Sequence, residues 1–293
     1  MLLLISFRAF AQEESSANEA MGFSRILRDP VAAGKAFTGN ASSHNVAWAT
    51  FMNPSLLVFH NGLADVSGSY QSFSPSGGVS GSAVSAGAGA NFGAIGLTAG
   101  FVSARYEDDG GFIPSDLQAG GGAAVRLGRS LSIGASFRVL QSQLDTDLKL
   151  SATAFTLMAT FSSSESFRLS AGLTNAGSLK TDSGSYPLAS SAALAAEYDL
   201  KLAETTRVSF DADMDYYLSS GCLSAALGAE FALWNMIFVR GGYRLSTGSS
   251  PVVPSLYSFG AGFKFWRVRA DVAWTSGSPA FSNLLTASLG LSF

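Results

Sequence analysis

Charged residues, cysteine and histidine are all scarce in this chain of 293 residues. Charged side chains make up 13% of it, about half of the roughly 25% found in soluble domains. Hydrophobic residues make up 47%, which excludes a disordered chain. The 18 basic residues do not outnumber the 21 acidic ones, and the net charge of −3 therefore argues against a nucleic-acid partner. The single cysteine, Cys222, excludes a disulfide framework and a cysteine-based zinc site.

The chain also lacks the motifs of hydrolytic enzymes. Serine is abundant, but no G-x-S-x-G or S-x-x-K sequence accompanies it, and no Asp/His pair is placed to activate a serine. The only histidines, His44 and His60, leave little for metal or triad chemistry. We therefore expect a protein that is not an enzyme and that requires neither a cofactor nor a metal ion.

An uncharged stretch of unusual composition runs from Val66 to Ala104. Glycine and serine are so frequent in it that a membrane-spanning helix is excluded. A segment that is uncharged without being continuously apolar suits strands with one face in lipid and one face in a polar interior. Only closed barrels allow strands to span a bilayer, because every backbone polar group must find a partner. The composition thus predicts a transmembrane β-barrel.

Residues 1–11 have the pattern of a secretory signal peptide. The apolar run MLLLISF is followed by Ala9-Phe10-Ala11, an A-x-A cleavage site, and Gln12 is the expected mature N-terminus. A buried N-terminal strand is the alternative interpretation. A signal peptide together with the pattern of a transmembrane barrel predicts that the protein is located in the outer membrane of a Gram-negative bacterium.

Strict alternation of apolar and polar residues marks the strands. The clearest example lies between two tryptophans, with an apolar face of Trp266, Val268, Ala270, Val272 and Trp274 and a polar face of Arg267, Arg269 and Asp271. Eight residues of strand cover roughly 26 Å at about 3.3 Å per residue. Tilted as in a barrel, that length matches the separation of the two aromatic girdles of an outer-membrane protein.

The same pattern predicts about fourteen antiparallel strands between residues 62 and 293, the predicted barrel domain. They are expected near 63–73, 81–92, 93–105, 116–128, 129–142, 150–162, 166–175, 189–200, 205–217, 222–234, 235–246, 255–265, 266–276 and 284–293. The connections alternate between tight turns and longer loops, among them Tyr106–Ser115 and Ala176–Leu188. Outer-membrane barrels have this alternation, with the short turns and both termini on the periplasmic side.

Residues 12–61 do not alternate, yet they are too apolar for a mobile tail. We expect them to fold into the lumen as a small N-terminal plug, for which a fourteen-stranded barrel has room. Asn53-Pro54 is expected to form the turn that ends the plug and begins the first strand. His44 and His60 are then residues of the plug and of its boundary.

The plug sequence RDPVAAGKAFTGNASSHNVAWATFMNPSLL resembles the N-terminal signature of the PorV/PorQ family within the FadL-like barrels. That family carries an R-x-A-A-M-G-G-A run and an aromatic W/F-x-N-P-A-x-L element. The second maps onto Phe51, Asn53, Pro54, Ser55 and Leu56, whereas Gly34-Lys35 replaces the glycine pair of the first. The terminal Phe293 on an alternating last strand resembles the C-terminal signature of bacterial outer-membrane proteins.

This resemblance implies a fourteen-stranded barrel with a plug and two possible functions. PorV and PorQ are outer-membrane components of the type IX secretion system, and PorV-like members shuttle exported cargo from the translocon to the cell surface. Their partners are a large translocon and secreted cargo proteins. FadL-like members instead admit hydrophobic small molecules through the plug and an opening in the wall. Cargo shuttling is our first interpretation of the sequence, and hydrophobic uptake is the alternative.

Charged residues gather on the inward face of the predicted strands. Asp211, Asp213 and Asp215 form an acidic ladder, and the basic residues opposite are Arg240, Arg244, Lys264, Arg267 and Arg269. We expect these charges to neutralise one another and the plug, because an unpaired buried charge is costly. A charged docking surface is the alternative, and a metal site on the three aspartates is disfavoured because they span about 13 Å of strand.

Exposed aromatic residues on the longer loops are the expected anchors of an interface. The full set of candidate binding residues combines these, the Asn-Pro turn and the inward charges: Asn53, Pro54, Tyr106, Phe112, Tyr186, Asp211, Asp213, Arg240, Arg267 and Arg269.

Overall fold

The computed structural model describes residues 19–26, 29–107, 112–248, 251–279 and 281–293. The predicted signal peptide, residues 1–11, lies outside the described residues. Fifteen strands account for most of the chain: β1 Ala64–Phe73, β2 Gly81–Asn91, β3 Ile95–Tyr106, β4 Ser115–Leu127, β5 Leu131–Gln143, β6 Lys149–Ser164, β7 Phe167–Thr181, β8 Gly184–Pro187, β9 Ser191–Ala203, β10 Thr206–Tyr217, β11 Leu223–Leu233, β12 Ile237–Ser246, β13 Leu256–Phe265, β14 Val268–Ser276 and β15 Leu284–Ser292.

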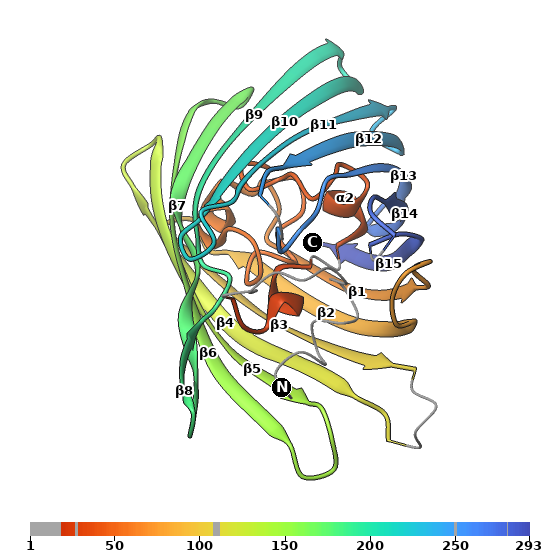
Figure 1. Ribbon diagram of the computed structural model, residues 1–293. Helices are drawn as coiled ribbons and strands as arrows, with labels where there is room; N and C mark the ends of the chain where they lie inside the picture. The colour runs from red at the N-terminus through yellow and green to blue at the C-terminus, as the bar shows by residue number, and fades with distance from the viewer. Residues whose placement is uncertain (1–18, 27–28, 108–111, 249–250, 280) are drawn as a thin grey trace.

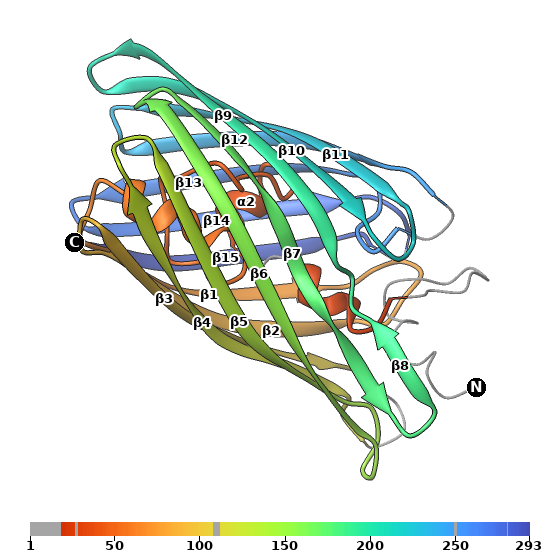
Figure 2. The same cartoon turned by 90° about the vertical axis from the view of Figure 1, so that its left-hand side faces the viewer.

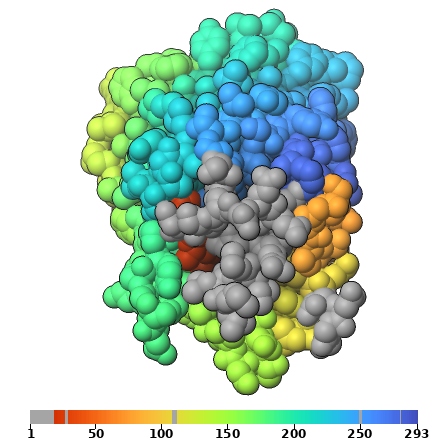
Figure 3. Space-filling model, viewed as in Figure 1, coloured from red at the N-terminus to blue at the C-terminus, as the bar shows by residue number. Residues whose placement is uncertain are grey.

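Fourteen of these strands close into an antiparallel barrel (Figure 1). Each strand pairs with its neighbours in sequence, β7 pairs with β9, and β15 pairs with β1 to complete the ring. The colours of successive strands follow one another around the rim in the space-filling view (Figure 3). The remaining strand, β8, pairs with the end of β7 only. The predicted strand number and antiparallel barrel are therefore confirmed.

Apolar side chains form a band over the outer face of the barrel wall. Large side chains such as Val66, Phe101 and Phe137 are exposed on it and alternate with buried residues that face the lumen. Aromatic residues border this band: Tyr70, Tyr216, Tyr243 and Tyr257 at one end, and Phe92, Trp234, Phe265, Trp266 and Phe293 at the other. This is the lipid-facing band of an outer-membrane protein, located in the outer membrane of a Gram-negative bacterium. Within the described residues, no helix has the length and hydrophobicity needed to cross a bilayer.

The two ends of the barrel differ in their connections. Tight turns such as 92–94 and 128–130 lie at the end that holds the C-terminal Phe293. In the side view that end is at the left, and β8 lies at the opposite end (Figure 2). By the general rule for outer-membrane barrels, the short-turn end faces the periplasm, and we call it the inner end.

The segment predicted as the loop Ala176–Leu188 is instead largely a β-hairpin at the outer end. Strand β7 continues to Thr181, and β8 pairs back onto it from Ser178 to Thr181. Gly184, with φ of 151°, forms the turn, and Leu179 and Leu188 are buried beneath it. Polar and small residues concealed this hairpin, because their alternation is weak.

The described part of the segment before the barrel lies inside it, as predicted for a plug. It contains two short 3₁₀ helices, η1 Gly22–Arg25 and η2 Pro54–Phe59, and one turn of α-helix, α2 Pro30–Ala33. Asp29 begins α2 by accepting hydrogen bonds from the backbone N–H groups of Val31 and Ala32. The described chain starts beside the outer hairpin, where Ala20 bridges Leu188, and reaches the inner end before β1.

Glycines on the barrel wall let the plug backbone approach closely. A side chain at Gly87 would overlap the carbonyl of Ala47, and one at Gly134 would overlap the backbone of Ser55. The other wall glycines where an added carbon would crowd the plug are Gly89, Gly96, Gly100, Gly228, Gly242 and Gly260. The glycine-rich composition of the strands thus provides the surface on which the plug packs.

Candidate functional site

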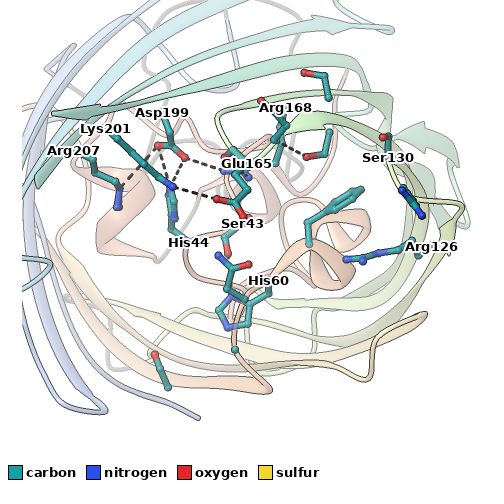
Figure 4. Close-up of a pocket in the computed structure, with 18 of the residues that line it drawn as sticks. Ser43, His44, His60, Arg126, Ser130, Glu165, Arg168, Asp199, Lys201 and Arg207 are labelled. Atoms are coloured by element: carbon teal, nitrogen blue, oxygen red, sulfur yellow. Dashed lines mark hydrogen bonds and ion pairs between the residues drawn. The ribbon is translucent and has the colours of Figure 1, made fainter. Parts of the chain in front are cut away.

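A polar pocket of about 820 Å³ occupies the inner end of the lumen (Figure 4). Plug residues Ser43, His44 and His60 face it from one side. Strand ends and turns of the barrel supply the rest of its wall, including Ser130 and Glu165. The pocket therefore lies where the lumen meets the periplasm.

Positive charge predominates in this inner pocket. Its basic residues are Arg126, Arg129, Arg168, Lys201, Arg207, Lys264 and Arg267, and its acidic residues are Glu165 and Asp199. Arg168 and Arg207 form ion pairs with carboxylates of the wall. Arg126 lies over the ring of Phe59 at 5.1 Å from its centroid. Charged and polar residues are thus in the majority among those that line this pocket.

Arg267 was predicted to lie on a strand and to face the lumen; it borders the inner pocket, but it does not lie on a strand. Residues 266 and 267 form the turn between β13 and β14, with Trp266 in a left-handed conformation at φ of 54°. Arg267 is consequently exposed at the rim, where its guanidinium lies over the rings of Trp266 and Phe293. The alternation of apolar and polar residues continues across the turn, so the sequence pattern wrongly assigned Arg267 to the strand.

The acidic ladder of β10 holds the plug in the middle of the lumen. Lys35 donates to Asp211 at 2.6 Å, and both side chains are almost fully buried. Asp213 accepts hydrogen bonds from the backbone and side chain of Asn40. Asp215 forms an ion pair with Arg25 at 2.8 Å. Each aspartate therefore has a different plug group as its partner; charge neutralisation is seen for Asp211 and Asp215, whereas Asp213 binds the uncharged Asn40.

The basic residues opposite are neutralised within the wall or by the plug. Arg240 contacts Glu230 at 2.6 Å and Asp271 at 2.8 Å, and Arg269 contacts Asp271 at 2.7 Å. Arg244 instead donates to the backbone carbonyls of Ala36 and Phe37 in the plug. The inward position predicted for Arg240 and Arg269 is confirmed by these contacts.

Burial affects the pKa values of two plug residues, Asp29 and Lys35. Desolvation raises the pKa of Asp29 to about 6, although its hydrogen bond from Val31 opposes the shift. Desolvation lowers the pKa of Lys35, but the attraction of Asp211 outweighs it and the net shift is upward. Lys35 therefore remains charged inside the lumen.

An apolar cluster fills the outer part of the lumen beside the hairpin. Plug residues Met21 and Phe23 pack there against wall residues Leu140 and Leu179, with Leu188 between the strands. All five side chains are buried. This cluster is covered by the first described residues of the plug. It is one of several apolar clusters of buried residues, another of which joins Phe37 of the plug to Phe73 and Leu256 of the wall.

Asn53 and Pro54, two of the predicted binding residues, are buried and inaccessible. Asn53 begins η2, accepts hydrogen bonds from the backbone and hydroxyl of Ser55, and donates to Thr160 of β6. It does not lead directly into the first strand, which starts at Ala64. Its role in the structure is to fix the plug to the wall.

The loop aromatics are less available than predicted. Tyr106 ends β3, packs on Phe73 and donates to Asp116. Tyr186 packs against the outer apolar cluster, and Phe112 is half-buried. Sequence reasoning missed the apolar residues Met21 and Phe23, whose only signal was their place at the start of a plug.

Comparisons with known proteins identify the fold. A scan against protein-family models finds no match, and a search of curated protein sequences finds none. Among solved structures, the monoaromatic hydrocarbon channel CymD has a TM-score of 0.64 at 14% identity, covering 90% of this chain and 97% of that one. The toluene transporter TodX of Pseudomonas putida has a TM-score of 0.64 at 13% identity, covering 89% and 96%.

The toluene transporter TbuX of Ralstonia pickettii is similar to the same extent, with a TM-score of 0.60 at 12% identity over 90% of this chain and 97% of that one. A FadL homologue of Pseudomonas aeruginosa also matches, with a TM-score of 0.59 at 10% identity over 90% and 95%. The chain therefore has the FadL-like fold, a barrel with an internal plug. At these identities the likeness concerns the fold alone, and none of the neighbours supports the narrower PorV/PorQ resemblance.

Proposed function

We propose that the protein is an outer-membrane uptake channel for hydrophobic small molecules. The observation that carries this proposal is the apolar cluster of Met21, Phe23, Leu140, Leu179 and Leu188, at the outer end where a solute would enter. Other apolar clusters also hold the plug, but this one is formed by the first described residues of the plug, beside the outer hairpin. The hydrocarbon channels with the same fold add to this proposal by analogy.

The plug must move for a molecule to pass. Apart from the inner pocket, the two cavities found among the described residues have volumes of about 30 Å³ each, room for about one water molecule. We infer that a hydrophobic molecule displaces Met21 and Phe23 from the outer apolar cluster and takes over their contacts with Leu140 and Leu179. Binding of this kind exchanges one apolar contact for another and costs little desolvation.

The wall beside this cluster is irregular. The pairing of β6 with β7 shifts between Phe155 and Leu157, and Asn175 opposite has a left-handed backbone with φ of 57°. Such bulges interrupt the hydrogen-bond ladder and often occur next to functional sites. In the described structure the Asn175 side chain is hydrogen-bonded to Arg138 and Ser24, so lateral passage toward lipid at this seam would require these bonds to open.

Cargo shuttling in type IX secretion is the second candidate. It would require recognition groups on the outer surface, and Tyr106 and Tyr186 are instead partly buried against neighbouring side chains. Among the described outer loops, Ile113 and Leu218 remain exposed. These positions favour uptake over cargo binding.

Uptake can be measured with radiolabelled toluene in cells that express the protein and in cells that do not. We expect faster accumulation of toluene with the protein and no change for a polar sugar of similar size. Affinity purification from the same membranes provides the second measurement. Co-purification of a translocon or of secreted cargo, with no effect on toluene, would contradict uptake and support shuttling.

A further inference from the structure

A histidine of the plug meets two carboxylates of the barrel wall above the inner pocket. His44 Nε2 lies 3.0 Å from Asp199 Oδ2 and 3.5 Å from Glu197 Oε1. Figure 4 shows His44 and Asp199 directed toward each other at the pocket wall. Glu197 and Asp199 are two residues apart on β9, so both side chains point inward. The three ligand atoms lie within 4.8 Å of one another.

One oxygen of this cluster has no hydrogen-bond partner. Glu197 is 1% exposed, and its Oε1 receives no hydrogen bond from the part of the chain that the structure describes. Burying a carboxylate oxygen without a partner is unfavourable, by about 1–3 kcal/mol or more for a charged group. The oxygen points toward His44 Nε2 at a distance that is long for a hydrogen bond.

The spacing of these atoms suits a tetrahedral ion. Zinc binds histidine nitrogen and carboxylate oxygen at about 2.0–2.2 Å, which places neighbouring ligand atoms roughly 3.3–3.5 Å apart. The two separations from His44 Nε2, 3.0 and 3.5 Å, bracket that range. A fourth ligand can come from water, because His44 is 29% exposed to the inner pocket.

The surrounding groups leave the required lone pairs available. Arg168 donates to Glu197 Oε2 at 2.8 Å and to Asp199 Oδ2 at 3.2 Å, so Glu197 Oε1 stays free for a cation. Ser209 donates to Asp199 and fixes its orientation. Arg207 also approaches Asp199, with Nε 4.0 Å from Oδ1, but its closest ion pair is with Glu230 at 2.6 Å. Among the described lysine and arginine residues, Arg168 is the one that donates hydrogen bonds to the two carboxylates.

We propose that His44, Glu197 and Asp199 form a binding site for a zinc-class divalent cation that fastens the plug to the barrel. His44 belongs to the plug, whereas both carboxylates belong to β9, so one ion would join two parts of the chain that are otherwise in contact through hydrogen bonds. The ion would replace the long His44–Glu197 contact with two direct bonds. The site is separate from the outer apolar cluster and therefore does not depend on the uptake proposal.

Zinc binding can be measured by calorimetry on the folded protein in detergent, purified without a histidine tag and treated with a chelator. Zinc chloride is the only ligand added. We expect saturable binding of one ion per chain. In the variant His44→Gln, the amide retains a hydrogen bond to Asp199 but provides no imidazole ligand, and the affinity should fall by at least about 100-fold.

His60→Asn is the matched control, because His60 is the only other histidine and its Nδ1 contacts the carbonyl of Ser43. This variant should bind zinc as the unmodified protein does. Hydrogen exchange of the plug should slow with zinc in the unmodified protein but not in His44→Gln. Absence of saturable binding to the unmodified protein, or equal affinity in His44→Gln, would overturn the proposal.

Discussion

Single charged residues determine how the plug is held in the lumen. Alternation along each strand predicted which of them face inward, and this succeeded for Asp211, Asp213, Arg240 and Arg269. It failed for the strand position of Arg267, because a pattern of alternating residues does not reveal where a turn replaces a strand. The plug partners of the β10 aspartates lie more than a hundred residues away in sequence, as in Lys35 and Asp211, and no local pattern predicts them.

Removing Lys35 should loosen the plug. Lys35→Met would leave Asp211 buried without its partner at a cost of about 3–5 kcal/mol. Hydrogen exchange of residues 29–41 measures this as faster opening of the plug. The double variant Lys35→Met with Asp211→Asn should recover most of the protection, because neither charge remains. Unchanged exchange in Lys35→Met would show that this ion pair does not hold the plug.

The lipid-facing residues provide a test of the barrel surface. Ala270 faces outward near the middle of β14, between Phe263 and Leu289 of the neighbouring strands. Ala270→Arg should destabilise the barrel in lipid vesicles by about 2–4 kcal/mol, as measured by denaturant unfolding. Val268→Arg is the control, because it lies at the inner end of the same strand and should cost about 0–1 kcal/mol. Equal effects at both positions would contradict the inferred depth of Ala270 in the membrane.

At the scale of elements, the strands and the presence of a plug were predictable, whereas the path of the plug was not. Each strand carries its own alternating signal, so the fourteen barrel strands follow from local sequence. The hairpin of β7 and β8 was missed because its burial depends on Leu179 and Leu188 meeting the plug. The path of η1, α2 and η2 depends on contacts with wall glycines, which carry no periodic signal.

The close contact between η2 and the wall provides the test at this scale. Gly134→Ala would push a methyl group into the backbone of Ser55, so η2 must move away from β5. We expect faster hydrogen exchange in residues 53–59 and an intact barrel. Gly68→Ala on β1 is the control, because its added carbon would lie 3.7 Å from the nearest atom. If both variants exchange alike, the plug does not depend on close packing at Gly134.

The whole molecule combines a lumen occupied by the plug with an apolar cluster near its outer end and a charged pocket at its inner end. Polar anchors run along the plug, from Arg25 on Asp215 close to the apolar cluster to Lys35 on Asp211. The proposed uptake therefore requires the contacts of Met21 and Phe23 at the outer end to open. Length, composition and strand number predicted the barrel and its membrane, but the sequence did not decide between cargo shuttling and uptake, because the apolar cluster appears only after folding.

A reversible lock on the plug tests the uptake account most directly. Ala20 bridges Leu188, so cysteines at these two positions, in a chain carrying Cys222→Ser, should form a disulfide that holds Met21 and Phe23 in the cluster. Toluene uptake into vesicles should stop in the oxidised protein and return on reduction. In the single variant Ala20→Cys, oxidation should not change the rate of toluene uptake. Uptake that continues at the same rate with the disulfide formed would contradict passage through the outer apolar cluster.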